Sequence, residues 1–462
     1  MDAVPLDQLA QFAEAVRQNG DGTRLVTNLS TDSRTTRPGD LFVALRGDNF
    51  DGHKFVSQAT DRGAIGAIVE KTWTGKPSPD LCLLRVSDTL RAYQQIAAQY
   101  RRSLGLKVIA ITGSNGKTST KDFTASVLGR RFRVTKTEGN FNNHVGLPRT
   151  ILQAGKEDEI AVWEIGMNHP GEIAPLARLA QPDVAIITNI GAAHIEFMGS
   201  REAIAQEKGE LAASLGQDGI LILNSGDEFA QTIAQRTSGR VIFAGIEHGE
   251  VHASEIAQTA SGAEFTILEG AHHCRAFLPV PGLHMVQNAL LAIATGRAFG
   301  VSLEDCAAGL ASAPLTKARL QIKDIGGIQF IDDSYNANPD SMKAALRTLA
   351  ELETAGARIA VLGQMAELGA ESTRGHQEVG ETAASLGIDR LIDLGTGEIA
   401  AAAKAAGLTN SQVAANAEEA SNLLRASAHP GDLVLVKGSR TARTERVLEA
   451  FAQPQSEARS AS

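Results

Sequence analysis

The chain has 462 residues, of which 43% are hydrophobic and 21% are charged. At about 150 residues per domain, this length predicts roughly three domains, each long enough to bury a core. The formal net charge of −9 and an aromatic content of 4% argue against a general affinity for nucleic acid or for anionic membranes.

The cysteines and the N-terminal residues bear on the cellular compartment in which the protein is expected. Cys82, Cys274 and Cys306 lie far apart in the sequence and form no CxxC pair, so they predict neither a disulfide framework nor a zinc site. The N-terminal residues lack the basic and apolar regions of a secretion signal, and no apolar run approaches the ~18 residues of a membrane span. We therefore expect a cytoplasmic protein without membrane insertion.

The first region, residues 1–86, is predicted to be a small α/β domain. Apolar strands are expected at 41–45 and 64–69, and the segment 72–80, rich in Gly, Pro and Ser, is expected to be a loop. Asp88 then has the position of an N-cap for the helix that follows.

The second region, residues 87–316, alternates apolar strands with helical patterns. Strands are expected at 108–111, 160–163, 184–187 and 220–223. A helical pattern covers 203–215, whereas 241–281 contains short strand-like segments. The alternation predicts a central domain built on a parallel sheet, and the later segments predict a β extension of that sheet.

The third region, residues 317–462, repeats the alternation of strands and helices. Strands are expected at 329–331, 358–362, 390–394 and 433–436. This pattern predicts a Rossmann-like C-terminal domain. The expected fold class is therefore α/β with three domains.

A glycine-rich segment between an apolar strand and a helix carries the strongest signal in the sequence. The residues expected to cradle the phosphates of ATP are Gly113, Ser114, Asn115, Gly116, Lys117, Thr118 and Ser119. Backbone N–H groups of such a loop converge on phosphate oxygens. Lys117 would neutralise the β- and γ-phosphates, and the Thr118 hydroxyl would ligate Mg²⁺. The usual spacing requires glycine at position 111, where this chain has Ile111, and the alternative is an ordinary glycine-rich turn.

This loop resembles the variant phosphate loop of the Mur ligases and folylpolyglutamate synthetases, which use ATP to join an amino group to a carboxylate. Further segments resemble motifs of that family in the same order: Glu138–Asn143, Trp163–Met167, Thr188–His194, Gly282–Asn288, Ala318–Leu320, Asp332–Pro339 and Lys437–Arg440. Because the resemblance covers nearly the whole chain, the sequence is identified as a member of this family.

The resemblance implies a metal site beside the phosphate loop. Glu164, His194 and Lys208, together with Thr118, match family positions that hold Mg²⁺, and the matching lysine is carbamylated (N6-carboxylysine) in Mur ligases. Carbamylation requires a neutral amine, and therefore a lysine with a lowered pKa. Taken singly, Glu164 reads as a helix cap, His194 as a structural histidine and Lys208 as a solvated surface lysine.

Other matching positions imply contacts with the nucleotide. In the family pattern Asn288 and Arg319 approach ATP, and Asp333 follows a strand where it would accept hydrogen bonds from the ribose. Lys437 and Arg440 match positions on the side of the acyl phosphate, although each also reads as an ordinary surface charge.

A second glycine-rich segment, residues 394–400, fits the G-x-G-x-x-A dinucleotide fingerprint after a strand. The match is isolated, and a tight turn in a Rossmann-like domain accounts for it. We therefore do not expect a nicotinamide cofactor.

The N-terminal region resembles the uridine-nucleotide domain of the later Mur ligases, which folylpolyglutamate synthetases lack. The resemblance rests on Ser30–Arg34, Pro38–Gly47 and Phe50–His53. The residues expected to contact the UDP-sugar are Ser33, Arg34, Arg46, Asn140 and Asn143.

Two C-terminal segments, 333–339 and 363–369, look like those of family members that add D-alanyl-D-alanine, although Gln364 stands where Asp is more usual. The implied reaction joins D-alanyl-D-alanine to UDP-N-acetylmuramoyl-tripeptide with ATP, through an acyl phosphate, in a monomer. The alternatives are the preceding ligase, which adds diaminopimelate or lysine to the dipeptide, and a non-catalytic regulator on the same scaffold. The third residue of the tripeptide stays open.

Overall fold

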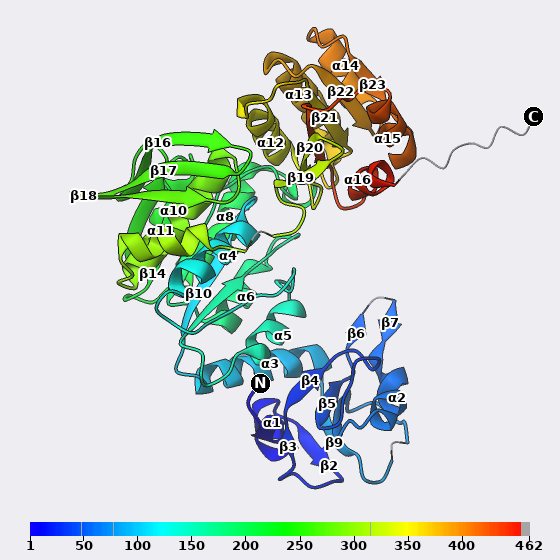
Figure 1. Cartoon of the computed structure of the whole chain (residues 1–462). Coiled ribbons are helices and arrows are strands. Elements are labelled where there is room, and N and C mark those ends of the chain that lie inside the picture. Colours follow the sequence, from blue (N-terminus) through cyan, green and yellow to red (C-terminus); the bar gives the residue numbers. More distant parts are fainter. Residues whose placement is uncertain (48, 77, 315, 454–462) are drawn as a thin grey trace, which may run out of the picture.

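The computed structural model describes residues 1–47, 49–76, 78–314 and 316–453. Three large sheets follow one another along the chain, each with its own helices, and two two-stranded sheets, β1-β3 and β6-β7, belong to the N-terminal unit (Figure 1). In Figure 1 the N-terminal unit lies at the bottom, the central unit in the middle and the C-terminal unit at the top. The α/β class is therefore confirmed.

The N-terminal unit is built on a five-stranded sheet. Its elements are β1 (Val4–Pro5), α1 (Leu6–Phe12), β2 (Val16–Gln18), β3 (Leu25–Val26), β4 (Asn28–Ser30), β5 (Asp40–Val43), β6 (Arg46–Gly47), β7 (Phe50–Asp51), a 3₁₀ turn (Gly52–Phe55), α2 (Val56–Asp61), β8 (Gly66–Glu70) and β9 (Cys82–Val86). The strand order is β2-β9-β8-β5-β4, with β4, β5, β8 and β9 parallel and β2 antiparallel. The predicted strands are present with ends shifted by one or two residues.

Helix α3 (Thr89–Ser103) joins this unit to the next. The Asp88 side chain accepts a hydrogen bond from the Arg91 N–H at 2.9 Å, so Asp88 is the N-cap as predicted. Tyr93, Ile96 and Tyr100 recur at helical spacing on its buried face. They belong to one apolar cluster that extends from the N-terminal sheet into the central sheet.

The central unit contains a nine-stranded sheet. Its elements are β10 (Lys107–Thr112), α4 (Lys117–Leu128), β11 (Val134–Lys136), α5 (Gly146–Gln153), β12 (Ile160–Glu164), α6 (Ile173–Ala180), β13 (Val184–Ile187), α7 (Ile195–Met198), α8 (Arg201–Ala213), β14 (Ile220–Asn224), α9 (Ala230–Ala234), β15 (Arg240–Gly245), β16 (Val251–Thr259), β17 (Gly262–Glu269), β18 (His272–Leu278), α10 (Leu283–Ala298) and α11 (Leu303–Ala311). The order is β11-β12-β10-β13-β14-β15-β16-β17-β18.

The parallel sheet and its β extension lie where the sequence predicts them; that the last strands are antiparallel was not predicted. Strands β11 to β16 pair in parallel, and β17 and β18 add an antiparallel extension. Both faces of β10 are buried, because Ile109 and Ile111 enter one apolar cluster while Val108 and Ala110 enter another. The short edge strand β11 was not predicted.

The C-terminal unit carries a six-stranded sheet. Its elements are β19 (Gln321–Ile325), β20 (Ile328–Asp333), α12 (Pro339–Glu351), β21 (Arg358–Gly363), a 3₁₀ turn (Gly369–Glu371), α13 (Ser372–Ser385), β22 (Arg390–Leu394), α14 (Glu398–Ala405), β23 (Ser411–Val413), α15 (Ala417–Arg425), β24 (Leu433–Lys437) and α16 (Glu445–Ala452). The order is β19-β20-β24-β21-β22-β23, parallel except for β19. The four predicted strands form its interior, and the two edge strands were not predicted.

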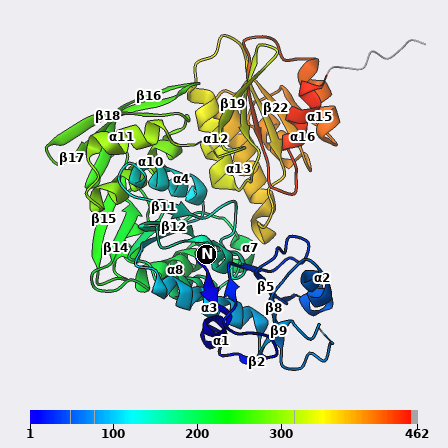
Figure 2. The same cartoon turned by 60° about the horizontal axis from the view of Figure 1, so that its bottom comes forward.

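The units are arranged so that the loops after the central strands face the C-terminal unit. Figure 2 shows α12 and α13 of that unit on the side of α4 and α7. Asp340 on α12 accepts from the Ala192 N–H of the central unit at 2.9 Å, and Asn338, the N-cap of α12, bonds to the phosphate loop as described below. Within the described residues, no helix is long and apolar enough to cross a membrane.

Candidate active site

The glycine-rich segment forms the turn between β10 and α4, as predicted. Gly113 and Gly116 have φ values of +149° and +79°. A Cβ on Gly113 would lie 1.8 Å from Thr188 Oγ1, and one on Gly116 would lie 2.4 Å from Asn288 Oδ1. Both positions therefore require glycine, because of the backbone and because of close polar neighbours. Ile111, which stands where the usual phosphate-loop motif has glycine, is fully buried inside β10. This difference from the usual motif therefore lies in the strand and not in the loop.

Lys117 folds back over the loop from the first position of α4. Its Nζ donates to the Gly113 carbonyl at 2.8 Å and to the Ser114 carbonyl at 3.4 Å. Burial lowers the pKa of Lys117, and the nearby Glu164 carboxylate partly opposes this effect. The ammonium is thus held where a phosphate bound by the loop would meet it.

Glu164 ends β12 and is 3% exposed. Its Oε2 accepts from Thr118 Oγ1 at 3.0 Å, and its Oε1 accepts from Asn142 Nδ2 at 2.8 Å. Ile111 pairs with Glu164 in the sheet, which brings this carboxylate beside the phosphate loop. The interpretation of Glu164 as a helix cap is wrong, because its carboxylate oxygens bond to side chains from two other segments.

The oxygen atoms of Thr118 and Glu164 fit Mg²⁺. Hard oxygen donors are its preferred ligands, and it usually takes one or two carboxylates together with water and substrate phosphates. Over residues 1–47, 49–76, 78–314 and 316–453, no group of three or more His, Cys, Asp and Glu side chains is placed to hold a metal. The two oxygens of Thr118 and Glu164 leave coordination positions for water and for the phosphates of a nucleotide.

Lys208 is buried on α8 and is only 1% exposed. Among the described residues its Nζ has no hydrogen-bond or ion-pair partner. Burial, and then the charge of Lys117, place the pKa of Lys208 well below 10.5, while Glu207 opposes the shift. The interpretation of Lys208 as a solvated surface lysine is wrong.

His194 lies at the interface with the C-terminal unit. It has a left-handed φ of 63°, and its Nδ1 is 2.5 Å from Glu367 Oε2. Its hydrogen-bond partner is thus a carboxylate of the Gly363–Gly369 segment and not a group of the phosphate loop. The metal role of His194 stays a prediction.

The C-terminal unit reaches the phosphate loop through two further side chains. Arg319 Nη2 donates to Thr118 Oγ1 at 3.2 Å, while its guanidinium lies 4.4 Å from the Tyr335 ring centroid. Arg319 Nε is buried without a partner, which leaves a donor free for an anion. Asn338 Nδ2 donates to Asn115 Oδ1 at 2.8 Å. Neither Tyr335 nor Asn338 was predicted as a site residue, although both lie in a recognised motif.

Asn288 and Asp333 lie on either side of the same junction. Asn288, on α10, is 4% exposed and faces Gly116. Asp333, at the end of β20, accepts from Lys437 Nζ at 2.6 Å in a buried ion pair. The nearby His284 has its pKa lowered to about 4 by burial, and Asp333 opposes this shift. The Asp333 carboxylate is therefore already paired with Lys437 in this structure. Its predicted contact with the ribose stays a prediction.

The predicted UDP-sugar residues are spread over two units. Ser33 Oγ donates to Gln58 Oε1 at 2.7 Å, Arg34 pairs with Asp32, and Arg46 pairs with Glu70 at 3.2 Å. These three residues come from the N-terminal unit, and each already has a protein partner.

The two predicted asparagines, by contrast, are exposed in the loop before α5. Asn143 Oδ1 accepts from the Gly146 N–H at 2.8 Å, whereas Asn140 has no side-chain hydrogen bond among the described residues. It is Asn142 between them that meets Glu164. The motif indicated the segment, but not which amide faces the carboxylate.

The second glycine-rich segment is a tight turn into α14, as predicted. Gly397 has a left-handed φ of 84° and lies against the apolar Val413 side chain. Gln364 is exposed, and its carbonyl accepts from the Ser439 N–H at 3.1 Å. Arg440 is also exposed and pairs with Glu445.

Comparison with known proteins gives matches along the whole chain. Three family models match: "Mur ligase family, catalytic domain" over residues 25–101, "Mur ligase middle domain" over 111–296 and "Mur ligase, glutamate ligase domain" over 318–440. The UDP-N-acetylmuramoyl-tripeptide–D-alanyl-D-alanine ligase of Bacillus subtilis is 41% identical, covering 92% of this chain and 93% of that protein. The enzyme of that name from Escherichia coli is 37% identical, covering 98% and 99%.

Solved structures agree with these matches. A crystal structure of MurF from Acinetobacter baumannii superposes with a TM-score of 0.90 at 34% identity, covering 98% of this chain and 100% of that one. MurF ligase from Thermotoga maritima in complex with ADP gives a TM-score of 0.83 at 29% identity, covering 92% and 97%.

Proposed function

The chain belongs to the Mur ligase family, and we infer that it is the ATP-dependent ligase that adds D-alanyl-D-alanine to UDP-N-acetylmuramoyl-tripeptide. The product is the pentapeptide precursor of peptidoglycan. The observation that carries this inference is the assembly of the half-buried Lys117 and Thr118 with the buried Glu164 at the phosphate loop, in a chain that matches such ligases over nearly its full length.

The phosphate loop and Lys117 bind and orient ATP. The first N–H groups of α4 and the loop point toward bound phosphate, and the helix dipole adds to the attraction. Lys117 now donates to two loop carbonyls, and it exchanges them for phosphate oxygens when ATP enters. Arg319 approaches from the C-terminal unit with a free Nε donor. The loop, Lys117 and Arg319 thus surround the phosphoryl group that is transferred.

Thr118 and Glu164 would hold Mg²⁺. When bound there, the ion would offset the negative charge of the phosphates and of the attacking carboxylate. Two hydrogen bonds fix Glu164. Asn142 Nδ2 donates to its Oε1 at 2.8 Å, and its backbone N–H donates to Thr137 Oγ1 at 2.9 Å. The carboxylate is therefore oriented before ligands arrive.

The reaction proceeds through an acyl phosphate. A carboxylate oxygen of the tripeptide attacks the γ-phosphorus, and ADP leaves. The amine of D-alanyl-D-alanine then attacks the acyl carbon, inorganic phosphate leaves, and an amide bond forms. Because water would hydrolyse the acyl phosphate, closure of the C-terminal unit over the central unit is expected to exclude it.

Lys208 would act as a carbamate. Its burial, its lowered pKa and the absence of a partner among the described residues support a neutral amine, which is the form that reacts with carbon dioxide. A carbamate would replace a buried cation by a carboxylate facing Lys117. Intact-protein mass spectrometry at neutral pH tests this: one added carbon dioxide, lost in Lys208→Met, is expected, and an unmodified mass would contradict it.

We also propose the domain limits, the oligomeric state, the cellular location and the UDP-sugar contacts of the protein. Domain limits at 86/87 and 316/317 are supported because each of the three large sheets lies within one of the resulting ranges. A monomer remains part of the proposal, and a cytoplasmic location is supported by three free cysteines and nucleotide substrates. Ser33, Arg34, Arg46, Asn140 and Asn143 are retained as proposed UDP-sugar contacts on the family resemblance of their segments; Asn140 and Asn143 are exposed in the loop whose Asn142 bonds to Glu164.

Phosphate release by the purified protein tests the function. ATP, Mg²⁺ and UDP-N-acetylmuramoyl-tripeptide are supplied with and without D-alanyl-D-alanine, and a parallel set pairs the dipeptide substrate with diaminopimelate or lysine. Turnover that requires tripeptide and D-alanyl-D-alanine is expected. Turnover only in the parallel set would identify the protein as the preceding ligase, which adds diaminopimelate or lysine. No phosphate release in either set would favour a non-catalytic regulator.

A further inference from the structure

Two neighbouring charged residues on α4, Lys121 and Asp122, are buried. Lys121 is 3% exposed and Asp122 is 7% exposed, about one helical turn after Lys117. Lys121 Nζ donates to the Thr137 carbonyl at 2.8 Å and lies 3.4 Å from Asp122 Oδ1. The same Oδ1 accepts from Lys136 Nζ at 2.6 Å. Burial favours the neutral acid, but Lys121 and Lys136 outweigh it and lower the pKa of Asp122.

The second carboxylate oxygen of Asp122 reaches the segment that joins the central unit to the C-terminal unit. Asp122 Oδ2 accepts from Thr316 Oγ1 at 2.5 Å. Thr316 is half-buried and lies between α11, the last helix of the central unit, and β19, the first strand of the C-terminal unit. Asp122 therefore fastens the start of the C-terminal unit to the helix that begins at the phosphate loop.

Arg319 follows Thr316 by three residues, and the backbone around it has an unusual conformation. Ala318 and Leu320, on either side of Arg319, have left-handed φ values of 57° and 51°. The Ala318 carbonyl accepts from the Tyr335 N–H at 3.2 Å. Because such a conformation persists only where the surroundings hold it, the direction of the Arg319 side chain depends on the contacts of this segment.

Helix α4 holds the segment at two points. Thr118 and Asp122 are four residues apart and therefore lie on the same face of the helix. Thr118 Oγ1 accepts from Arg319 Nη2 at 3.2 Å. Asp122 accepts from Thr316, three residues earlier in the chain than that arginine. Without the hydrogen bond at Thr316, one of the two ties that keep Arg319 at the phosphate loop is lost.

We propose that Asp122 and Thr316 are positioning residues for ATP, because their hydrogen bond fixes residues 316–320 so that Arg319 meets the phosphates. The inference rests on the proposed function, in which Arg319 approaches the phosphoryl group that is transferred. A contact that only stabilised the fold would affect all substrates alike when it is lost. A contact that acts through Arg319 affects the binding of ATP.

The threonine is the residue to change. Replacing Asp122 would leave Lys121 and Lys136 without their carboxylate, which is strongly destabilising. Thr316→Val removes only the hydroxyl, and is expected to raise the KM for ATP roughly 3- to 10-fold in the phosphate-release assay. The KM for UDP-N-acetylmuramoyl-tripeptide is expected to stay unchanged. Thr316→Ser keeps the hydroxyl and is expected to restore the KM for ATP.

A double variant shows whether the effect passes through the arginine. Arg319→Gln is expected to raise the KM for ATP by itself. In that background Thr316→Val is expected to cause no further rise, because the side chain that it positions is gone. The same fold-change in both backgrounds, an equal change in the KM of both substrates, or failure of Thr316→Ser to restore the KM would overturn the proposal.

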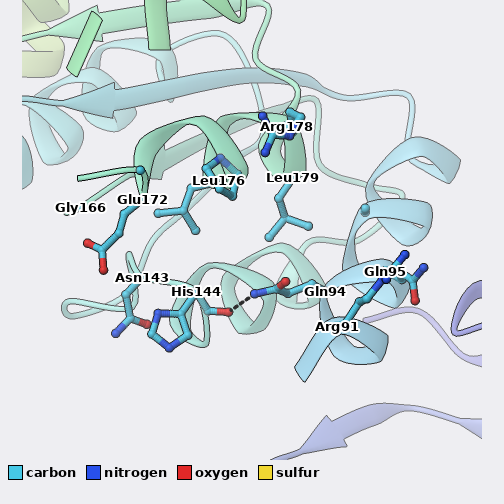
Figure 3. Close-up of a pocket in the computed structure, with 13 residues that line it drawn as sticks. Arg91, Gln94, Gln95, Asn143, His144, Gly166, Glu172, Leu176, Arg178 and Leu179 are labelled. Atoms are coloured by element: carbon cyan, nitrogen blue, oxygen red, sulfur yellow. Dashed lines mark hydrogen bonds between the residues drawn. The ribbon is translucent and has the colours of Figure 1, made fainter. Parts of the chain in front are cut away.

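Two controls break other hydrogen bonds of the central unit. Ser126→Ala, also on α4, removes a hydroxyl that donates to the Gly309 carbonyl at 2.7 Å. Gln94→Leu removes the donor to the His144 carbonyl at 2.9 Å, beside a pocket of about 420 Å³ between α3 and α6 (Figure 3). Both variants are expected to leave the KM for ATP unchanged, and a rise equal to that of Thr316→Val would overturn the proposal.

The outcome for the proposed function is separate. Absence of phosphate release by the unchanged protein would overturn the proposed function. The Kd for ATP, measured by calorimetry with Mg²⁺ in the same variants, then takes the place of the KM. An unchanged Kd in Thr316→Val would overturn the positioning role.

Discussion

Two glycine-rich turns between a strand and a helix differ in the origin of the side chains around them. At the first, Gly113 and Gly116 approach Thr188 and Asn288 within distances that leave no room for a Cβ. At the second, Gly397 meets the methyl groups of Val413. The local backbone is similar at both turns, whereas the side chains that neighbouring elements bring to them are different.

The difference shows what makes such a turn a phosphate site. Around the first turn, Glu164 comes from the adjacent strand, Asn288 from α10 and Arg319 from the C-terminal unit. Around the second, the Asp393 carboxylate accepts from the Ala400 N–H and so bonds to the start of its own following helix. A glycine-rich turn thus becomes a site when elements distant in sequence supply charges and donors to it.

The largest effect is expected from removing the lysine of the first turn. Lys117→Ala should lower phosphate release at least 10²- to 10³-fold, because no other ammonium group in the part of the chain that the structure describes donates to the loop carbonyls. Binding of the UDP-substrate, measured by calorimetry, should stay largely intact. Lys404→Ala, in the helix after the second turn, is the control and should retain full activity. If a folded Lys117→Ala protein lost both phosphate release and UDP-substrate binding, Lys117 would not serve ATP alone, and the prediction would be contradicted.

A smaller loss is expected from neutralising the acid beside the loop. Glu164→Gln keeps the shape of the side chain but removes the charge, and should reduce turnover roughly 10- to 100-fold and raise the Mg²⁺ concentration needed for half-maximal rate. Asp393→Asn is the matched control variant, since Asp393 is also a buried carboxylate and is the next-to-last residue of its strand, β22. Turnover of that variant should be unchanged; an equal loss in both variants would remove the distinction between the two turns.

The contact between α12 and the phosphate loop should have an intermediate effect. Asn338→Ser keeps an N-cap for α12 but is too short to reach Asn115, so it loses the 2.8 Å hydrogen bond between the units. The KM for ATP should change by roughly 2- to 10-fold with little change in thermal stability. Asn416→Ser alters an N-cap of α15 that has no such contact and serves as the control. Identical ATP kinetics in both variants would argue against a role for this contact.

The smallest effect concerns the pair formed by His194 and Glu367. The hydrogen bond from His194 lowers the pKa of Glu367 below its usual 4.5. The unfolded chain therefore takes up this proton at higher pH than the folded one, and stability falls as the pH decreases through the window below 4.5. Glu367→Gln should remove less than about 1 kcal/mol of stability at pH 6, since the pair is partly exposed.

Urea denaturation at several pH values checks this expectation. The difference between the unchanged protein and Glu367→Gln should shrink as the pH is lowered below 4.5. A difference that is constant with pH would show that the titration of Glu367 does not contribute.

The fold was largely predictable because its interior strands are apolar on both faces. Strands such as β10, β13, β21 and β24 stand out as continuous apolar runs between helical patterns. The short edge strands β11, β19 and β23 escaped prediction, since few of their residues are fully buried and their pairing depends on a neighbouring strand.

The sequence by itself determined the class of the fold, the position of the phosphate loop and the segments that contribute to the site. These depend on local patterns: apolar periodicity, glycine at positive φ and residues fixed in short motifs. Only the tertiary structure decided which member of each motif acts, as with Asn142 rather than Asn140 or Asn143 beside Glu164. It also decided that Lys208 is buried near another lysine. Burial and contact between distant segments arise from packing of the whole chain, and no local pattern encodes them.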